Sequence, residues 1–185
     1  MSEHTYDYDF FVIGGGSGGV RAARMAAQRG AKVGLAEAAA LGGTCVNVGC
    51  IPKKLYSYAA HYAAEFEEAA GFGWDVGAAK LDWAKLKSRR AAEITRLNGI
   101  YLNLLHGAGV EILRGWATLC DGHTVQVQTS EGHKKSVTAK FILVATGGTP
   151  SGSGAASGSG AASASLQPSG SASPSGAASP SLVGS

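Results

Sequence analysis

The first forty residues alternate apolar runs with glycine turns in the order that a βαβ unit requires. Tyr8–Ile13 is a short apolar run, and a turn of five glycines and one serine follows it directly. Val20–Gln28 then has the spacing of a helix, and Lys32–Ala36 is a second apolar run that ends at Glu37. This order predicts a strand, a tight turn, a helix and a parallel strand, which together start a Rossmann-like α/β domain.

Two long helices are predicted to follow. Lys54–Ala70 carries apolar and aromatic residues at helical spacing, and we expect this stripe to pack in the core. Its members are Leu55, Tyr58, Ala59, Tyr62 and Phe66. Asp82 is a suitable N-cap for a second helix that continues to about His106. The apolar positions of this second helix also predict an inward stripe, formed by Trp83, Leu86, Ile94, Leu97, Leu104 and Leu105.

After residue 110 the hydrophobic period changes to two, which predicts strands. Four short strands are expected, at Val110–Leu113, Ala117–Leu119, Thr124–Gln128 and Lys135–Thr138. Two turn signals, each an acidic residue followed by glycine, lie between them, so we expect a small antiparallel β-meander. Phe141–Ala145 predicts a final buried strand that leads into Thr146 and Gly147.

Residues 151–185 differ in kind from the rest of the chain. They are almost wholly serine, glycine, alanine and proline, with no charged and no aromatic residue. Such a segment cannot bury enough apolar surface to offset its ordering entropy, so we expect a disordered tail after an ordered unit at 1–150. A shifted reading frame is our preferred explanation, and a natural low-complexity tail is the alternative. The coding DNA downstream of Pro150 would distinguish the two.

The net charge and the hydropathy of the chain indicate which kinds of partner and which cellular compartment to expect. The formal net charge is +3 with no run of lysine or arginine, so we expect neither a nucleic acid nor an anionic membrane surface as partner. No apolar stretch is long enough to span a bilayer, and the N-terminus lacks the pattern of a secretory leader. We therefore expect a cytoplasmic protein. In a reducing compartment a close pair of cysteines is more often catalytic than structural.

Cys45 and Cys50 are such a pair, and the remaining cysteine, Cys120, lies beside a turn and is expected to be structural. In an ideal helix the Cα atoms of the pair would lie roughly 8–9 Å apart, from a rise of about 1.5 Å per residue. A disulfide needs about 4.4–6.8 Å. The pair can therefore bond only if the helix is distorted, which Gly49 and Pro52 would permit. The spacing alone allows three interpretations: redox exchange, two buried apolar side chains, or a metal site. A metal site would need further ligands close in the sequence, which are missing, so we expect no metal.

Gly14, Gly16 and Gly19 fit the G-x-G-x-x-G fingerprint of dinucleotide-binding domains. Glycines at these positions allow the tight turn and let the backbone approach a pyrophosphate at the helix N-terminus. Glu37 follows at about the distance expected for a carboxylate that binds ribose hydroxyls, the alternative being a solvated residue at the strand end. Nicotinamide cofactors and FAD both bind this fingerprint, so the motif alone does not choose between them.

The segment Gly42–Lys54, GGTCVNVGCIPKK, closely resembles the redox-active disulfide signature of the pyridine nucleotide–disulfide oxidoreductases. The lysine pair at its end is most similar to the glutathione reductase branch of that family. The resemblance extends over about Tyr8–Pro150 and implies a flavoprotein that binds FAD at the first fingerprint. It also implies that NADPH reduces the FAD, and that the Cys45–Cys50 pair in turn reduces glutathione disulfide.

The resemblance also implies roles for single residues. Cys50 would face the flavin and Cys45 would attack the substrate disulfide. Lys53 would lie near the flavin's reactive nitrogen, and a helix start beside it would favour the thiolate. Arg24 and Tyr101 would contact glutathione, the alternatives being a surface arginine and a core aromatic. The residues implied in FAD binding are Gly14, Gly16, Ser17, Gly18, Gly19, Glu37, Gly43, Thr44, Cys45, Lys53, Ala117, Thr146 and Gly147.

Several parts of the full family pattern do not occur in this sequence. There is no second dinucleotide fingerprint for NADPH, and none of the five histidines lies in the context of the family's C-terminal general acid. The interface domain of the family's homodimer is also absent, so we expect a truncated form that is inactive alone. The alternatives are a non-catalytic FAD-binding remnant, or a reductase of lipoamide, trypanothione or mercuric ion. Lys54 and Arg24 argue against lipoamide and mercury.

Overall fold

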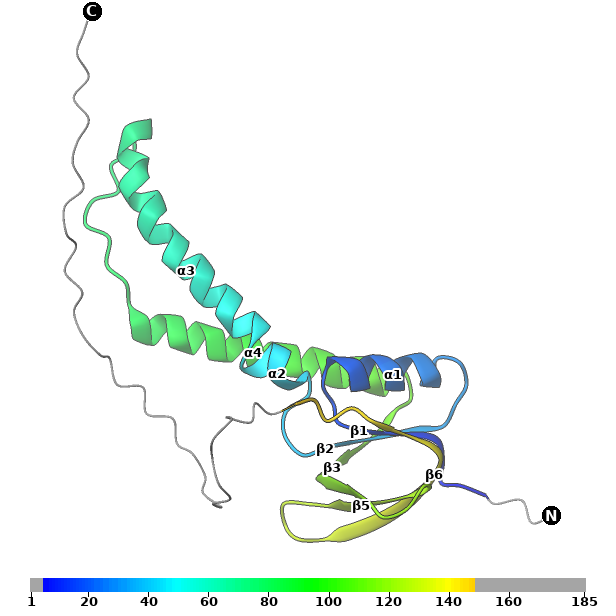
Figure 1. Ribbon diagram of the computed structural model, residues 1–185. Coiled ribbons are helices and arrows are strands. Elements are labelled where there is room, and N and C mark those ends of the chain that lie inside the picture. The colour runs from blue at the N-terminus through cyan, green and yellow to red at the C-terminus, as the bar shows by residue number, and fades with distance from the viewer. Residues whose placement is uncertain (1–4, 149–185) are drawn as a thin grey trace, which may run out of the picture. The chain divides into compact units, whose positions relative to one another are not determined.

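A computed structural model describes residues 5–148 of the chain (Figure 1). Its elements form an α/β fold in which one sheet carries both parallel and antiparallel strands. The βαβ start, the two long helices and the meander that the sequence predicts all occur within this range. The predicted tail at 151–185 lies outside the described residues.

Six strands form the described sheet, in the order β3-β2-β1-β6-β5-β4. Their bounds are β1 (Tyr8–Ile13), β2 (Val33–Glu37), β3 (Glu111–Arg114), β4 (Trp116–Leu119), β5 (Thr124–Gln128) and β6 (Lys134–Val144). β1 is paired in parallel with β2 and β6, and β2 is paired in parallel with β3. β4, β5 and β6 are antiparallel neighbours, so the meander forms the other part of the same sheet.

One expectation about the sheet is wrong. We expected separate strands at Lys135–Thr138 and Phe141–Ala145, but β6 is one continuous strand that contains most of both. Its first part pairs antiparallel with β5, and its second part pairs parallel with β1. No glycine or proline lies within it, so the chain stays extended while its partner changes. β6 therefore joins the meander to the parallel strands.

Four α-helices accompany the sheet in the described residues. They are α1 (Ser17–Ala27), α2 (Gly43–Asn47), α3 (Cys50–Glu68) and α4 (Trp83–Gly107), and a short 3₁₀ segment, Ala69–Phe72, follows α3. The sequence did not predict α2. The predicted N-cap of α4 is confirmed, because Oδ1 of Asp82 accepts a hydrogen bond from the backbone N–H of Lys85 at 2.9 Å. Figure 1 shows α1 and the C-terminal part of α4 over the sheet, whereas α3 extends away from it.

The core consists of two clusters on opposite faces of β1. One lies on the meander side and includes Phe11 and Ile13, together with inward residues of β5 and β6. The other, which we call the helix-side cluster, is formed by Val12, Val20, Ala23, Val33, Leu35, Leu41, Leu105 and Val110. Because side chains alternate along a strand, neighbouring residues of β1 reach different clusters. β1 is therefore packed on both faces, as a central strand of a largely parallel sheet should be.

The expectation that the aromatic stripe of α3 is core is wrong. Tyr58, Tyr62 and Phe66 are 54%, 56% and 42% exposed, and only Pro52 in this helix is fully buried. The inward stripe predicted for α4 is only partly confirmed, because Leu105 is buried while Trp83 is half exposed. Helical periodicity identifies an apolar face but does not say whether a partner covers it. None of the helices in residues 5–148 combines the length and the apolar character that crossing a membrane requires.

Candidate functional site

The first part of the site is the glycine turn between β1 and α1. β1 ends at Ile13, and α1 begins at Ser17 with Gly16 as its N-cap. No side chain caps this helix end, and Ser17 and Gly18 are exposed. α1 therefore begins with exposed residues and no side-chain cap at the positive end of its helix dipole, which suits an anion such as a diphosphate.

Close backbone contacts explain why the turn needs glycine. Gly14 has a φ of +108°, and a Cβ there would strike the carbonyl oxygen of Ala145. At Gly19 a Cβ would strike the carbonyl oxygen of Gly14. The missing side chain at Gly14 thus lets the turn lie against the residue that follows β6, and the missing side chain at Gly19 lets α1 lie against the end of β1.

Glu37 lies at the end of β2 and is bound to the glycine turn. Its Oε2 accepts a hydrogen bond from the backbone N–H of Gly15 at 2.6 Å, and its Oε1 accepts one from that of Ala39 at 2.7 Å. Glu37 is therefore a partly buried, fixed carboxylate and not a freely solvated residue at a strand end. Its contact with ribose hydroxyls remains a prediction.

A cavity of about 150 Å³ opens beside this carboxylate. Its lining residues are Ile13, Gly14, Ala36, Glu37, Ala38, Gly115, Trp116, Ala117 and Thr146. Four of the predicted cofactor residues, far apart in sequence, thus line one cavity: Gly14, Glu37, Ala117 and Thr146. The cavity lies where the strand order reverses around β1, at the carboxyl ends of the parallel strands, and ligands of open α/β sheets bind there.

Trp116 and Gly115 are cavity residues that the sequence analysis missed. The backbone N–H of Gly115 donates to the carbonyl oxygen of Glu37 at 3.0 Å, which brings the start of β4 to the end of β2. The side chain of Trp116 is 72% exposed, so it offers an aromatic surface at the cavity edge. A tryptophan directly before Ala117 is the signal in the sequence that could have identified it.

The second part of the site is the cysteine segment. Its two cysteines can meet only if they do not lie on one continuous helix, and the chain is indeed divided there into α2 and α3. α2 ends at Asn47 and α3 begins at Cys50, while the N–H groups of Val48 and Gly49 both donate to the carbonyl oxygen of Thr44. The predicted distortion is therefore confirmed.

Cys45 and Cys50 are free thiols that lie within hydrogen-bond reach of each other. Cys50 is exposed, which contradicts the alternative of two buried apolar side chains. The hydrogen bond with Cys50 raises the pKa of the Cys45 thiol above its usual value. The helix start beside Lys53, which was expected to favour a thiolate, belongs to α3, and Cys50 is its first residue. Within residues 5–148, no group of three His, Cys, Asp or Glu side chains is arranged to hold a metal ion.

The cysteine segment lies against the glycine turn. The backbone N–H of Gly42 donates to the carbonyl oxygen of Gly15 at 2.8 Å, and Gly16 and Gly42 form an isolated parallel bridge. At Gly43, where φ is +60°, a Cβ would lie 2.8 Å from the Cα of Gly16. The predicted residues Gly16 and Gly43 are thus in direct contact, and α2 begins beside the start of α1.

The remaining predicted residues lie outside the cavity beside Glu37. Lys53 is exposed in the first turn of α3, and Gly147 is exposed after β6. Tyr101 packs against the helix-side cluster, which agrees with the alternative of a core aromatic. Arg24 is half-buried on α1, and its Nε is buried without a hydrogen-bond partner among the described residues. Arg24 and Tyr101 occupy neighbouring helices, since α1 and α4 are in contact.

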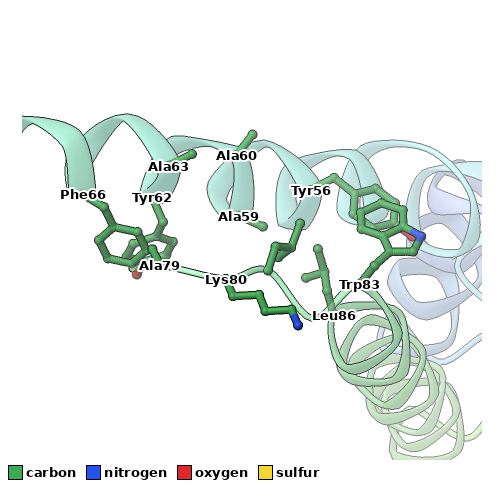
Figure 2. Close-up of a pocket in the computed structure, with 11 residues that line it drawn as sticks. Tyr56, Ala59, Ala60, Tyr62, Ala63, Phe66, Ala79, Lys80, Trp83 and Leu86 are labelled. Atoms are coloured by element: carbon green, nitrogen blue, oxygen red, sulfur yellow. The ribbon is translucent and has the colours of Figure 1, made fainter. Parts of the chain in front are cut away.

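A larger hollow between α3 and the start of α4 is a different kind of surface. It has a volume of about 480 Å³ and contains none of the predicted site residues. Figure 2 shows its aromatic walls, where Tyr56 stacks on Trp83 with ring centroids 5.4 Å apart, and Tyr62 lies beside Phe66. The rest of its lining consists of alanines, two leucines and Lys80, so the hollow is mostly apolar and has one charged side chain.

The fold and the glycine turn together define a dinucleotide-binding α/β domain that carries a dithiol segment. The family model described as "Pyridine nucleotide-disulphide oxidoreductase" matches residues 8–168. The chain therefore belongs to this family of oxidoreductases, as the resemblance predicted.

Several curated proteins that are similar to the chain are named glutathione reductases. The chain is 51% identical over 146 residues to the protein from Nostoc sp. (strain PCC 7120 / SAG 25.82 / UTEX 2576), a match that covers 79% of this chain and 31% of the relative. It is 51% identical over 145 residues to that of Burkholderia cepacia, covering 78% and 31%. It is 45% identical over 156 residues to the chloroplastic/mitochondrial protein of Pisum sativum, covering 78% and 27%. The chain thus spans less than a third of the length of these relatives.

Proposed function

We propose that this chain provides the FAD-binding and dithiol segment of a disulfide reductase that transfers electrons from NADPH to glutathione disulfide. The observation that carries the proposal is that one glycine turn contacts both Glu37 beside the cavity and the segment that bears Cys45 and Cys50. The relatives matched over this region are named glutathione reductases, which supports the choice of substrate.

The residues present fit a bound FAD. The exposed start of α1 offers N–H groups for the diphosphate, and Glu37 offers a fixed carboxylate for ribose hydroxyls. Ala117 would meet the adenine, while Thr146, Gly147 and Lys53 would lie toward the flavin end. When bound, FAD would supply a two-electron carrier between the nicotinamide cofactor and the dithiol.

The two cysteines would act on the substrate by thiol–disulfide exchange. The Cys45 thiolate attacks one sulfur of glutathione disulfide, which forms a mixed disulfide and releases one glutathione thiolate. The Cys50 thiolate then attacks the sulfur of Cys45, releases the second glutathione and closes the Cys45–Cys50 disulfide. Two electrons pass from the dithiol to the substrate. Arg24 and Tyr101 would bind the glutathione.

Turnover with NADPH should need more than this chain. The match covers 31% of the length of the Nostoc relative, so we propose NADPH-dependent activity only for a protein that also has the remaining parts. We expect the complete enzyme to be a cytoplasmic homodimer and this chain alone to bind FAD without NADPH-dependent activity. The alternative is a non-catalytic FAD-binding remnant.

Two measurements on the purified chain test the proposal. FAD added to the chain should be retained through desalting, and a flavin fluorescence titration should saturate at one FAD per chain. Exchange with glutathione disulfide should convert the Cys45 and Cys50 thiols to an internal disulfide, detected by mass after alkylation. Retention of FAD without exchange would favour the remnant. Failure to bind FAD would contradict both readings, and NADPH oxidation by the chain alone would contradict the expected incompleteness.

A further inference from the structure

The segment that carries Cys45 is held by a pair of asparagines, Asn47 within the segment and Asn98 in α4. Asn98, in α4, donates two hydrogen bonds through Nδ2: to the carbonyl oxygen of Leu41 at 2.8 Å and to Oδ1 of Asn47 at 3.0 Å. Asn47 is the last residue of α2 and lies between the two cysteines in sequence. Both bonds are partly buried and span more than fifty residues of chain.

The second amide of the pair continues the network into the start of α2. Nδ2 of Asn47 donates to the carbonyl oxygens of Gly43 at 2.9 Å and Leu41 at 3.2 Å. Carbonyl acceptors surround this nitrogen and a donor faces the oxygen, so the orientation of the amide is fixed. The two ends of α2 are thus tied together and tied to α4.

α2 needs such a tether because it is too short to hold itself. It has five residues, whereas isolated helices shorter than about 12–15 residues are marginal in water. Val46 is its one fully buried residue. α4 has 25 residues and is anchored at its C-terminal end by Leu105, which is fully buried in the helix-side cluster. Asn98 therefore connects the cysteine segment to a rigid part of the fold.

We propose that Asn98, acting through Asn47, is a positioning residue that sets the equilibrium between the dithiol and the disulfide of Cys45 and Cys50. This inference rests on the proposed redox role of the pair. On oxidation the two thiols lose two protons and two electrons and form one S–S bond. A small disulfide accepts these protons and electrons and becomes two thiols. Holding Cys45 beside Cys50 lowers the entropy cost of closing that bond.

The test uses the full chain with Cys120→Ser, which leaves only the two thiols of interest. The chain is equilibrated with mixtures of reduced and oxidised dithiothreitol, and the free thiols are counted by alkylation and mass spectrometry. We expect Asn98→Ala to lower the equilibrium constant for disulfide formation about tenfold, which is about 30 mV for a two-electron couple. Asn103→Ala is the matched control, because Asn103 is exposed on the same helix. It should leave the equilibrium unchanged.

A second pair of variants separates positioning from folding. Asn98→Asp keeps the side-chain volume but replaces the donor by an acceptor, so it should shift the equilibrium in the same direction as Asn98→Ala. Asn47→Ala should shift it too, and the double variant with Asn98→Ala should shift it by less than the sum of the two. Circular dichroism and urea unfolding report whether each variant is folded.

The experiment distinguishes a failure of the positioning role of Asn98 from a failure of the proposed redox function. An unchanged equilibrium in the folded Asn98 variants, or an equal shift in Asn103→Ala, would overturn the positioning role while leaving the redox pair intact. Loss of folding in both Asn98 variants, with Asn103→Ala folded, would assign Asn98 to global stability and would also overturn it. If the parent chain forms no disulfide in any mixture, the proposed redox function itself fails.

Discussion

Two neighbouring glycines at the start of α1 should respond to the same substitution in opposite ways. In Gly19→Ala the new methyl group would strike the carbonyl oxygen of Gly14 and lie 3.2 Å from Cγ1 of Val12. In Gly18→Ala the methyl group would have no atom within 4 Å. Both residues belong to the first turn of one helix, so the substitutions differ mainly in the space available.

The magnitudes follow from this difference in space. Alanine is favoured over glycine in a helix by about 0.5–1 kcal/mol, which applies to both variants. In Gly19→Ala overpacking opposes this gain at a cost of typically about 1–3 kcal/mol, occasionally more. Val12 is fully buried and the Gly14 carbonyl is backbone, so neither moves aside easily. With the overpacking cost at the upper end of its range, we expect Gly19→Ala to lower the free energy of unfolding by a net amount of about 2 kcal/mol or more and Gly18→Ala to keep it or raise it by up to about 1 kcal/mol.

Urea unfolding followed by circular dichroism measures both values, and unchanged m-values would show that the difference is one of stability. Because displacing α1 also displaces its leading N–H groups, Gly19→Ala should in addition weaken FAD binding about tenfold, or about 1.4 kcal/mol. The comparison with Gly18 concerns stability alone, since that residue is itself predicted to bind the cofactor. Equal stabilities of the two variants would refute the reasoning that α1 packs against the end of β1 through Gly19.

Three further predictions rest on single contacts. Glu37→Gln leaves one acceptor oxygen for two backbone N–H donors, so urea unfolding should show a loss of about 1–3 kcal/mol, and a stability equal to the parent's would contradict the bonding described. Leu105→Ala should cost about 2–5 kcal/mol by the same measurement, whereas Leu104→Ala, at a position 40% exposed, should cost clearly less. Asp7 accepts hydrogen bonds from the backbone N–H and, with a smaller effect, from the hydroxyl of Thr138, and these bonds lower its pKa below the usual 3.8. The ionised Asp7 side chain therefore stabilises the fold above about pH 4, and this stabilisation is lost as the pH falls through the lowered pKa. Asp7→Asn should reduce the acid sensitivity of unfolding in that range, and an unchanged pH profile would count against this assignment.

The βαβ start could be predicted because its signals are local. The apolar run of β1, the glycine turn and the apolar run of β2 follow one another within thirty residues, and each determines its own conformation. The N-cap at Asp82 is predictable for the same reason, since it depends on a bond three residues away. Helix limits were less accurate: α1 begins at Ser17, inside the glycine turn, because three small residues there can adopt helical geometry.

The features that the sequence did not predict depend on distant partners. β6 was expected to be two strands because its apolar pattern changes where its partner changes from β5 to β1, and that change is visible only in the folded sheet. The aromatic stripe of α3 was expected to be buried because periodicity alone indicates a core face, yet no described element covers Tyr62 or Phe66. α2 has too few residues to give a periodic signal.

The residues of the candidate site also divide into those that local sequence patterns predict and those that depend on distant contacts. The glycine turn and Glu37 follow from spacing, whereas Ala117 and Thr146 were identified only by resemblance and then found to line the same cavity. Trp116 and Asn98 were missed because their importance lies in contacts with residues far away in the sequence. Arg24 and Tyr101 lie on α1 and α4, two helices that contact each other, and the contact of both residues with glutathione remains a prediction.

Gly15 shows how the two parts of the site are coupled, although the fingerprint leaves its position unspecified. Its backbone N–H donates to the Glu37 carboxylate, and its carbonyl oxygen accepts from the N–H of Gly42, just before the dithiol segment. A Cβ at this position would lie 2.7 Å from the side chain of Leu41 and 3.0 Å from Oε2 of Glu37, so it would press on both neighbours at once. Gly15 therefore fixes the carboxylate beside the cavity and the start of α2 together, through the two peptide groups that flank it. A displacement of the turn must consequently change the geometry of the cavity and of the cysteine segment in the same step.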